Sequence, residues 1–540
     1  MRRFYFLITL LLIGVLALSA CASGGSPTDS SGAAAPSDAA ADTGADTASD
    51  TTSDAAATEP QTGGVLTAAI SADPQGFDPH LTSAYSSFEV LENVFDTLVS
   101  IDENLNITPS LAESWEVSED GLTWTFKLQE GITFHDGSDL TAEDVKFSYE
   151  RILDPDVGSG ASWRLANVES IEAVDDYTVA ITLNAPYPGL LAKLAGYKGM
   201  AIVSSEAENL ERMPIGTGPF MFVEYVPGDH VTLMRNENYW ETDAAGNALP
   251  YLDEVVFRPI PDETVKTTNL QTGEVDWVDS LPPQQVNSIA DAGDVMVDVV
   301  TGGDYWYLGV NLNREPLGDP LVRQAINYAI NKEDVAAAAR WDTAVASDNP
   351  IPAESAWNSG YAPYEYNPER AKELLAEAGY ADGFEVELMP SSQYEETVRA
   401  AQVVQAQLAD VGVTATIRTL EWGTWLEEQG AGNFDIYVGG WIGNIDPDDY
   451  FYAQHHTGEI FNFTGYSNEA LDALLDEGRA EADPDVRKGI YDQVAQILID
   501  DSPYVYMYIP ATVNAWQPNV HGVQARPDSA IRFKNAWMSQ

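Results

Sequence analysis

The chain has 540 residues, of which 26 are Lys or Arg and 85 are Asp or Glu, so its formal net charge is −59 at pH 7. This charge excludes a nucleic-acid-binding domain, because a surface so acidic repels phosphate groups. The hydrophobic share of 44% predicts a packed globular protein, and the length predicts two or three lobes.

The first residues have the pattern of an export signal. Arg2 and Arg3 precede an apolar stretch, residues 4–17, which is too short for a stable membrane span. Small residues then lead to Cys21, the only cysteine, which excludes an intrachain disulfide and a cysteine-built metal site. The stretch resembles a bacterial lipobox, which implies lipidation of Cys21. We predict a lipoprotein signal peptide over residues 1–21, with an ordinary signal peptide as the alternative.

The next segment, residues 22–62, consists mainly of Ala, Ser, Thr, Gly, Pro and Asp. It has no aromatic residue, Ile, Leu, Val, Lys or Arg, so it cannot bury enough apolar surface to offset its backbone entropy. We predict a disordered acidic tether between the lipid anchor and the folded body.

After residue 63 the pattern changes between strand and helix without a tandem repeat. Residues 123–128 alternate apolar and polar side chains, and residues 177–183 do the same, which predicts two half-buried strands. Thr141 can cap a helix that begins at Ala142. Capping residues and apolar stripes predict further helices over residues 320–330 and 369–378. The body is therefore predicted to be a mixed α/β protein.

The usual catalytic signatures are missing. The chain has no G-x-S-x-G, H-E-x-x-H or Gly-Lys sequence, so serine hydrolase, zincin and P-loop chemistry lack support. We predict that the adjacent pair His455 and His456 lies in a surface loop and does not bind a metal, because neighbouring side chains point apart. We expect a protein that is not an enzyme and needs no metal or cofactor.

One segment has the features of a binding site. Phe434, Ile436 and Val438 alternate with polar residues, and this predicted strand runs into Gly439 and Gly440. Two glycines expose backbone groups where the strand ends, which is where ligands bind in open α/β sheets. Three tryptophans at positions 422, 425 and 441 offer flat apolar walls, although the alternative is that they belong to the core.

Several longer motifs follow one another along the chain. They are Pro109-Ser110-Leu111-Ala112-Glu113-Ser114-Trp115, Asp120-Gly121-Leu122-Thr123-Trp124, Phe134-His135-Asp136-Gly137, Gly216-Thr217-Gly218-Pro219-Phe220, Asn238-Tyr239-Trp240, Val322-Arg323-Gln324-Ala325-Ile326-Asn327, Gly440-Trp441 and Asp446-Pro447. In kind and order these motifs resemble those of the peptide/nickel-binding family of extracytoplasmic solute-binding proteins of ABC importers. The resemblance runs from about residue 63 to the end of the chain.

The resemblance implies a bilobal α/β fold of the periplasmic-binding-protein type, type II, of the large peptide-binding-protein class, with two lobes joined by a two-strand hinge. Residues 63–306 and 511–540 would form the first lobe, and residues 307–510 the second. The crossings would lie near Tyr307 to Asn311 and near Met507 to Pro510. Closure about such a hinge would enclose the ligand.

In peptide-binding members, the resemblance implies an aspartate three residues after Trp441 that holds the ligand's ammonium group. This chain has Asn444 there, so the contact is lost or moved to Asp446. Gly216-Thr217-Gly218 suits either a hinge-side loop or a ligand contact. The candidate ligand contacts are Tyr85, Ser86, Thr217, Trp306, Trp422, Gly439, Gly440, Trp441, Asn444 and Asp446.

We therefore expect a monomeric binding lipoprotein, anchored to the cell membrane through Cys21 on the outer side. Its expected partners are a small ligand, a permease and the ATPase that drives the permease. A di- or oligopeptide is the first candidate ligand, and an oligosaccharide is the alternative because Asn444 lacks the charge of aspartate. Two other classes remain open at this point, an extracellular hydrolase with paired acids and a lipoprotein receptor or chaperone.

Overall fold

The computed structural model of the protein describes residues 59–540 with the exception of 197, 208, 444 and 540. Residues 59–540 form one compact unit. Cys21, the predicted signal peptide and nearly all of the predicted tether lie outside the described residues. No helix in the described ranges combines the length and the apolar character that a membrane span requires.

A sheet of 12 strands runs through this unit. Ten of them form one continuous path, and two more pair with the fifth strand of that path. In order, the path is β16 (Val413–Ile417), β15 (Phe384–Met389), β17 (Ile436–Trp441), β13 (Tyr305–Val310), β18 (Tyr504–Trp516), β11 (Trp277–Val278), β1 (Val65–Ile70), β10 (Glu254–Pro259), β9 (His230–Arg235) and β8 (Phe220–Val226), and the strands beside it are β12 (Met296–Thr301) and β14 (Ala344–Ala346).

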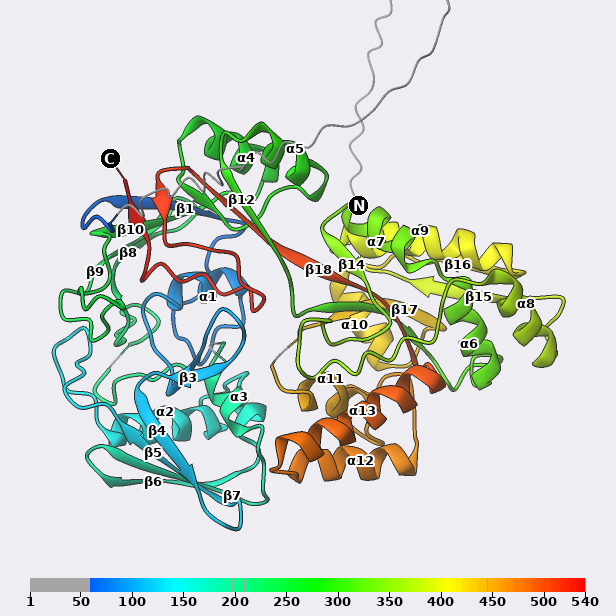
Figure 1. Ribbon diagram of the computed structural model, residues 1–540, viewed down its shortest axis with the longest axis horizontal. Helices are drawn as coiled ribbons and strands as arrows, with labels where there is room; N and C mark the ends of the chain where they lie inside the picture. The colour runs from blue at the N-terminus through cyan, green and yellow to red at the C-terminus, as the bar shows by residue number, and fades with distance from the viewer. Residues whose placement is uncertain (1–58, 197, 208, 444, 540) are drawn as a thin grey trace, which may run out of the picture. The chain divides into compact units, whose positions relative to one another are not determined.

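The long strand β18 divides this sheet into two halves (Figure 1). Its residues 504–508 pair with β13, and its residues 511–516 pair with β12, both antiparallel. We call lobe I the elements on the β11 to β8 side of β18, with everything that packs on them, and lobe II those on the β13 to β16 side. β18 thus has strand partners in both lobes, while the two crossings and the exact lobe boundaries remain a prediction.

Lobe I contains a second, four-stranded sheet in the order β4-β5-β7-β6. The strand predicted over residues 123–128 is confirmed, and its apolar face, Trp124, Phe126 and Leu128, is buried. The strand predicted over 177–183 begins one residue later. The sheet consists of β4 (Ala112–Val117), β5 (Thr123–Leu128), β7 (Thr178–Leu183) and β6 (Val168–Asp175).

Short helices cover the sheets of lobe I. Thr141 is the N-cap residue of α2 as predicted, and Asp144 completes a capping box by accepting from the backbone N–H of Thr141 at 3.0 Å. The elements are α1 (Tyr85–Leu91), α2 (Ala142–Leu153), α3 (Leu190–Ala195), α4 (Glu263–Thr272) and α5 (Val286–Ala292), the turns Ser162–Leu165 and Pro283–Gln285, and the strand pairs β2 (Val99–Ile101) with β3 (Ile107–Pro109) and β19 (Val520–His521) with β20 (Trp537–Met538).

Longer helices build lobe II around its half of the sheet. The helices predicted over residues 320–330 and 369–378 are confirmed within one residue at each end. Asp319 opens the first of them by accepting a hydrogen bond from the N–H of Leu321 at 2.9 Å. The helices are α6 (Pro320–Ala329), α7 (Lys332–Arg340), α8 (Pro368–Glu377), α9 (Glu395–Asp410), α10 (Trp422–Gly430), α11 (Asp448–His455), α12 (Glu469–Ala480) and α13 (Pro484–Asp501).

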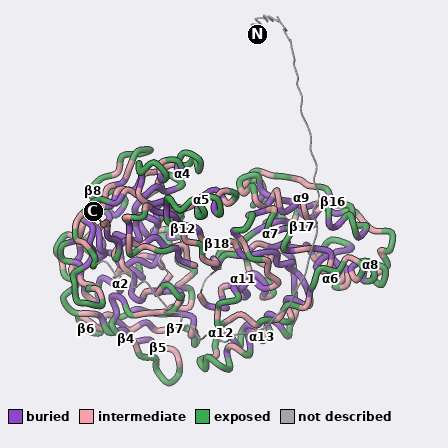
Figure 2. The backbone as a smooth tube through the Cα atoms, turned by 45° about the horizontal axis from the view of Figure 1, so that its top comes forward, coloured by how far each residue is buried: buried purple, intermediate pink, exposed green. Residues whose placement is uncertain are grey.

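Each lobe has its own hydrophobic cores, and Figure 2 shows buried segments running through the interior of both. One core of lobe II is aliphatic and lies under α6, α7 and α9. The other is rich in tyrosine, with the rings of Tyr307 and Tyr504 stacked at 3.9 Å between centroids. Because these cores do not merge with those of lobe I, the lobes are separate packing units that β18 connects.

Candidate functional site

The first turn of α1 brings one aromatic side chain to the surface of lobe I. Tyr85 is 44% exposed, its hydroxyl donates to the carbonyl oxygen of Ser529, and the ammonium nitrogen of Lys198 lies 4.9 Å from its ring centroid. Ser86, the next residue, is buried and donates from Oγ to the carbonyl oxygen of Asp73 at 3.1 Å. Tyr85 is therefore available to a ligand, whereas the Ser86 hydroxyl is used within the fold.

The Gly216-Thr217-Gly218 motif is a packing element. Thr217 has no exposed surface, and its hydroxyl donates to the carboxylate of Asp96 at 2.9 Å. A Cβ atom at Gly216 would lie 2.1 Å from the carbonyl oxygen of Val94, and one at Gly218 would lie 2.6 Å from the same residue. The glycines are needed for this close backbone approach. The geometry favours the loop alternative, so we leave Thr217 out of the proposed ligand contacts.

The end of β17 carries the glycine pair that the sequence singled out. Gly439 is buried and Gly440 is exposed. Trp306 lies on β13 directly opposite Gly440. A Cβ atom at Gly440 would lie 2.8 Å from the indole of Trp306. A side chain here would push against that ring, so the glycine keeps the indole flat against the strand.

This end of β17 also has a free edge. On one side, β13 pairs with β17 along its full length, from Ile436 to Trp441. On the other side, β15 pairs with β17 only at Ile436 and Tyr437. Within the described residues, the backbone of residues 438–441 therefore has no strand partner on that side. Unpaired N–H and C=O groups of an edge can receive an extended peptide as an added strand.

The three tryptophans near this edge have different surroundings. Trp425 is buried and its indole N–H donates to the carbonyl oxygen of Met389 at 2.9 Å, so it belongs to the core. Trp422 is half-buried and stacks on Trp425 with 4.9 Å between ring centroids. Trp441 is half-buried and meets Phe461 edge to face at 5.0 Å. Trp422 and Trp441 keep a partly open face, and Trp425 does not.

Asp446 is held by a cation of its own lobe. Both carboxylate oxygens accept from the guanidinium of Arg487, at 2.7 and 2.8 Å, and both side chains are buried. This bidentate pair occupies the carboxylate. We therefore leave Asp446 out of the proposed ligand contacts. Asn444, the other residue expected near a ligand ammonium, lies outside the described residues.

Ionic contacts join the two lobes at α3 and α11. The ammonium of Lys193 in α3 pairs with the carboxylate of Asp449 in α11, and both side chains are buried. Tyr187, just before α3, donates to Asp448 at 3.2 Å, and Arg479 of lobe II holds the same carboxylate at 2.9 and 3.0 Å. These are charged contacts in a poorly hydrated place, where electrostatic interactions are strong. These contacts connect lobe I to lobe II through residues outside β18.

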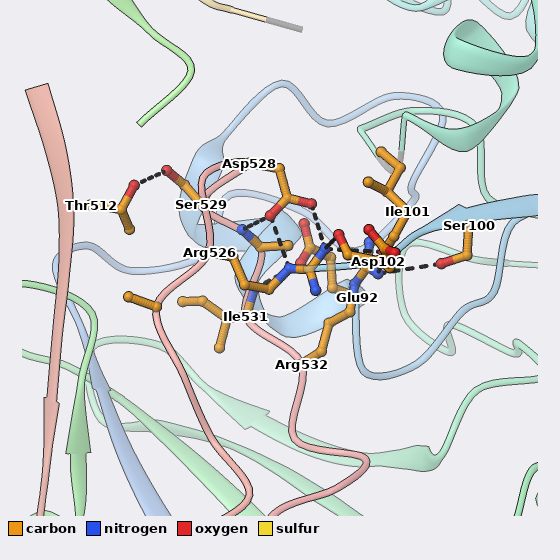
Figure 3. A network of polar contacts seen from close by, with 12 residues as sticks. Glu92, Ser100, Ile101, Asp102, Thr512, Arg526, Asp528, Ser529, Ile531 and Arg532 are labelled. Carbon is orange, nitrogen blue, oxygen red and sulfur yellow. Dashed lines mark hydrogen bonds and ion pairs between the residues drawn. The ribbon is translucent and has the colours of Figure 1, made fainter. Parts of the chain in front are cut away.

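The C-terminal segment is clamped on α1, as Figure 3 shows. Arg526 donates to the carbonyl oxygens of Ile101 and Asp102 at 3.0 and 2.9 Å. Glu92, at the end of α1, accepts from the N–H of Ile531 at 2.8 Å. Burial raises the pKa of Glu92 to about 7, although Arg532 opposes that rise. The clamp holds the carbonyl of the nearby Ser529 against Tyr85.

Sequence reasoning missed an acidic group around Tyr85. Glu89 lies one helical turn after Tyr85, on the same face of α1, and is 2% exposed. Its Oε1 atom is buried without a hydrogen-bond partner. Burial, and next the charge of Asp279, raise the pKa of Glu89 well above its usual range. No sequence signal distinguishes this glutamate among the chain's many acids.

Asp304 connects this acidic group to lobe II. It precedes β13, and its carboxylate accepts from the N–H of Gly443, two residues after β17, at 3.0 Å. Asp304 is itself exposed. The charge of Asp304 also acts on the Tyr85 hydroxyl, so the exposed ring of Tyr85 and the loop that follows β17 lie in one neighbourhood.

The histidines do not build a metal centre. Among the described residues there is no group of three or more His, Cys, Asp or Glu side chains arranged to hold a metal ion. The prediction of a surface loop at His455 is wrong, because His455 ends α11 and is fully buried. Burial lowers its pKa to about 3, so it is a neutral core residue. The end of α11 packs against the aromatic core of lobe II, where the His455 ring lies 4.5 Å from that of Tyr504. Residue spacing alone does not reveal this contact.

Two lobes of mixed α/β structure, connected by β18, are the architecture of a bilobal solute-binding protein of the type II periplasmic class. The model of one family, described as bacterial extracellular solute-binding proteins, family 5 Middle, matches residues 106–462, more than half of the chain. The protein belongs to this family. It is accordingly a substrate-binding protein of an ABC importer and not an enzyme.

Three relatives illustrate the range of ligands. The glutathione-binding protein GsiB of Salmonella typhimurium is 29% identical over 486 residues, covering 87% of this chain and 94% of the relative. DppA from Helicobacter pylori, solved with the peptide STSA, has a TM-score of 0.75 and 31% identity, covering 89% and 99% of the two chains. AgaA from A. tumefaciens R10, solved with agropinic acid, has a TM-score of 0.73 and 30% identity over 88% and 99%.

Proposed function

We propose that this substrate-binding protein captures a di- or oligopeptide between its lobes and delivers it to an ABC permease. The observation that carries the proposal is the free edge of β17 at residues 438–441. An extended peptide can pair with such an edge through its backbone, which makes binding tolerant of side-chain sequence. Trp441 and Tyr85 offer exposed aromatic surface nearby, and DppA, solved with a peptide, is similar over 89% of this chain.

Thermal unfolding of the purified protein in the presence of peptides tests this proposal. The set contains di- to nonapeptides, with glutathione and oligosaccharides as separate arms. A ligand at 100 times its Kd stabilises a protein by about 2.7 kcal/mol, which is a measurable rise in Tm. We expect stabilisation by peptides. Stabilisation by oligosaccharides alone would replace the peptide with a sugar as ligand.

A variant at the edge strand sharpens the test. Trp441→Leu removes a partly open indole beside the free edge and should weaken peptide binding by about tenfold. Trp115→Leu, in the four-stranded sheet of lobe I, is the matched control, because Trp115 is also half-buried and lies on β4. Equal affinity of both variants for a peptide that stabilises the wild type would contradict a ligand at β17.

We also propose that lipid on Cys21 anchors the protein to the outer face of the cell membrane. The proposal rests on the sequence pattern around Cys21 and on the extracellular character of the family. Cys21→Ser should move the protein from the membrane fraction to the soluble extracytoplasmic fraction. Unchanged membrane association of this variant would contradict the anchor.

A further inference from the structure

Four carboxylates lie around Tyr85, and three of them have partners. Glu92 accepts from the N–H of Ile531, Asp279 pairs with Lys266, and Asp304 accepts from the N–H of Gly443. The fourth, Glu89, is only 2% exposed and is the most buried of the four, yet its Oε1 has no hydrogen-bond partner. A buried polar atom without a partner is rare and costly, so it requires an explanation.

The nearest buried cation cannot serve Glu89. Lys266 has no exposed surface, and its ammonium already donates to Asp279, to Ser71 and to Ser280. An ammonium group has three N–H donors, and these three contacts use them all. The Lys266 ammonium therefore binds residues that follow β1 and β11, and it has no N–H group left to donate to Glu89.

The exposed side of the same helix face already accepts an ammonium group. Lys198 holds its Nζ 4.9 Å from the ring centroid of Tyr85, which is the geometry of a cation–π contact. Tyr85 and Glu89 are one helical turn apart on α1, so a cation on this ring is also close to the Glu89 carboxylate. A ligand cation that displaced Lys198 from the ring would lie near a buried carboxyl oxygen, Glu89 Oε1, that has no hydrogen-bond partner.

We propose that Tyr85 and Glu89 form a subsite for a cationic amine group, an ammonium or guanidinium, carried by the ligand. This inference rests on the proposed function, which supplies the ligand. It adds that lobe I binds the positively charged group of that ligand. The subsite joins an aromatic face to a desolvated carboxylate, the combination that stabilises organic cations. The described residues offer no three-acid metal cluster, which favours an organic cation over a metal ion.

Binding at this subsite should release a proton. Burial raises the pKa of Glu89, and so do the charges of Asp279 and Glu92, while Lys266 and Lys198 lower it. The free protein therefore keeps this carboxyl protonated to higher pH than an ordinary glutamate. A ligand cation favours the charged form, so the proton leaves when the cation arrives.

Calorimetric titration of the full chain tests the subsite with three sets of probes. The first set consists of free-amine peptides of two to nine residues, and the second of the same peptides with acetylated N-termini. The third consists of two amines that are not peptides, putrescine and agmatine. The variants are Glu89→Gln, which keeps the shape of the side chain, and the control Glu169→Gln, which removes an exposed acid on β6.

We expect N-acetylation to weaken peptide binding to the wild type by about 10- to 100-fold. Glu89→Gln should weaken the free-amine peptides by a similar factor and leave the acetylated peptides unchanged, and Glu169→Gln should behave as the wild type. The apparent enthalpy should differ between phosphate and Tris buffers for the wild type, because a proton is released. If Glu89→Gln does not fold, acetylation and the buffer comparison decide the matter on the wild type.

Three results would overturn the subsite. These are equal binding of free and acetylated peptides, equal binding of free-amine peptides by Glu89→Gln and the wild type, and no binding of any amine probe. The proposed peptide function fails separately. If putrescine or agmatine binds in a Glu89-dependent way and no peptide binds, the subsite stands and the ligand is an amine that is not a peptide.

Discussion

Two buried carboxyl groups, one in each lobe, differ in their hydrogen-bond partners. Asp446 in lobe II is held by the two terminal guanidinium nitrogens of Arg487, at 2.7 and 2.8 Å. Glu89 in lobe I is as well buried, but its Oε1 atom has no partner. A paired buried acid contributes to the fold, whereas an unpaired one carries a cost that the fold alone does not explain. The comparison teaches that the missing partner, and not the acid itself, marks a candidate site.

The largest effect should come from breaking the pair in lobe II. Arg487→Met leaves Asp446 buried without a cation, so the free energy of unfolding should fall by about 3–5 kcal/mol. The double variant Arg487→Met with Asp446→Leu should recover much of that loss, because no buried charge remains. Urea unfolding of the wild type and both variants measures these changes. If Arg487→Met is as stable as the wild type, the partner of Asp446 does not stabilise the fold, and a missing partner would no longer distinguish Glu89.

An acid with a partial partner gives an intermediate case. Burial raises the pKa of Glu92 from 4.5 to about 7, so between these pH values the folded chain keeps a proton that the unfolded chain loses. The stability that Glu92 contributes is therefore present below pH 4.5 and falls as the pH rises towards 7. The fall amounts to about 3 kcal/mol at most.

Glu92→Gln should remove this pH dependence, because an amide does not titrate but can still accept from the N–H of Ile531. Denaturant unfolding of the wild type and the variant, followed from pH 4.5 to 8, measures the difference between the two curves. Parallel curves would mean that the carboxyl of Glu92 titrates normally.

The smallest effect concerns the pair that crosses between the lobes. Lys193→Met leaves Asp449 without its cation only while the lobes are in contact, so a bound peptide should dissociate about five to ten times faster. Lys146→Met, which breaks the exposed pair with Glu150 in lobe I, is the control and should leave dissociation unchanged. Stopped-flow tryptophan fluorescence measures the rate. Equal rates for both variants would confine the pair to a structural role.

Local signals predicted the elements well. The strand at residues 123–128, the cap at Thr141 and the helix that begins at Pro320 follow from alternation, capping residues and apolar stripes, which act over a few residues. The bilobal fold followed from the family resemblance, because no local pattern reveals that β18 pairs with strands of both lobes.

The candidate site was predicted less completely. The sequence could single out Gly440 and Trp441 because a strand that runs into glycines is visible in it; their contact with a ligand stays a prediction. The pairing of Asp446 with Arg487 could not be predicted, since Asp446 lies in a loop and its partner lies 41 residues away on α13. Glu89 could not be found at all, because an unpaired acid is recognised only when every neighbour is known.

The strand β18 has a consequence for how the chain is made. It lies close to the C-terminus, and its 13 residues complete the β-sheet of lobe II with one half and that of lobe I with the other. Neither lobe can finish its sheet until these last residues are available, although most of lobe I is synthesised first. Both lobes therefore depend on the same late strand, so neither should reach its full stability before β18 has been synthesised.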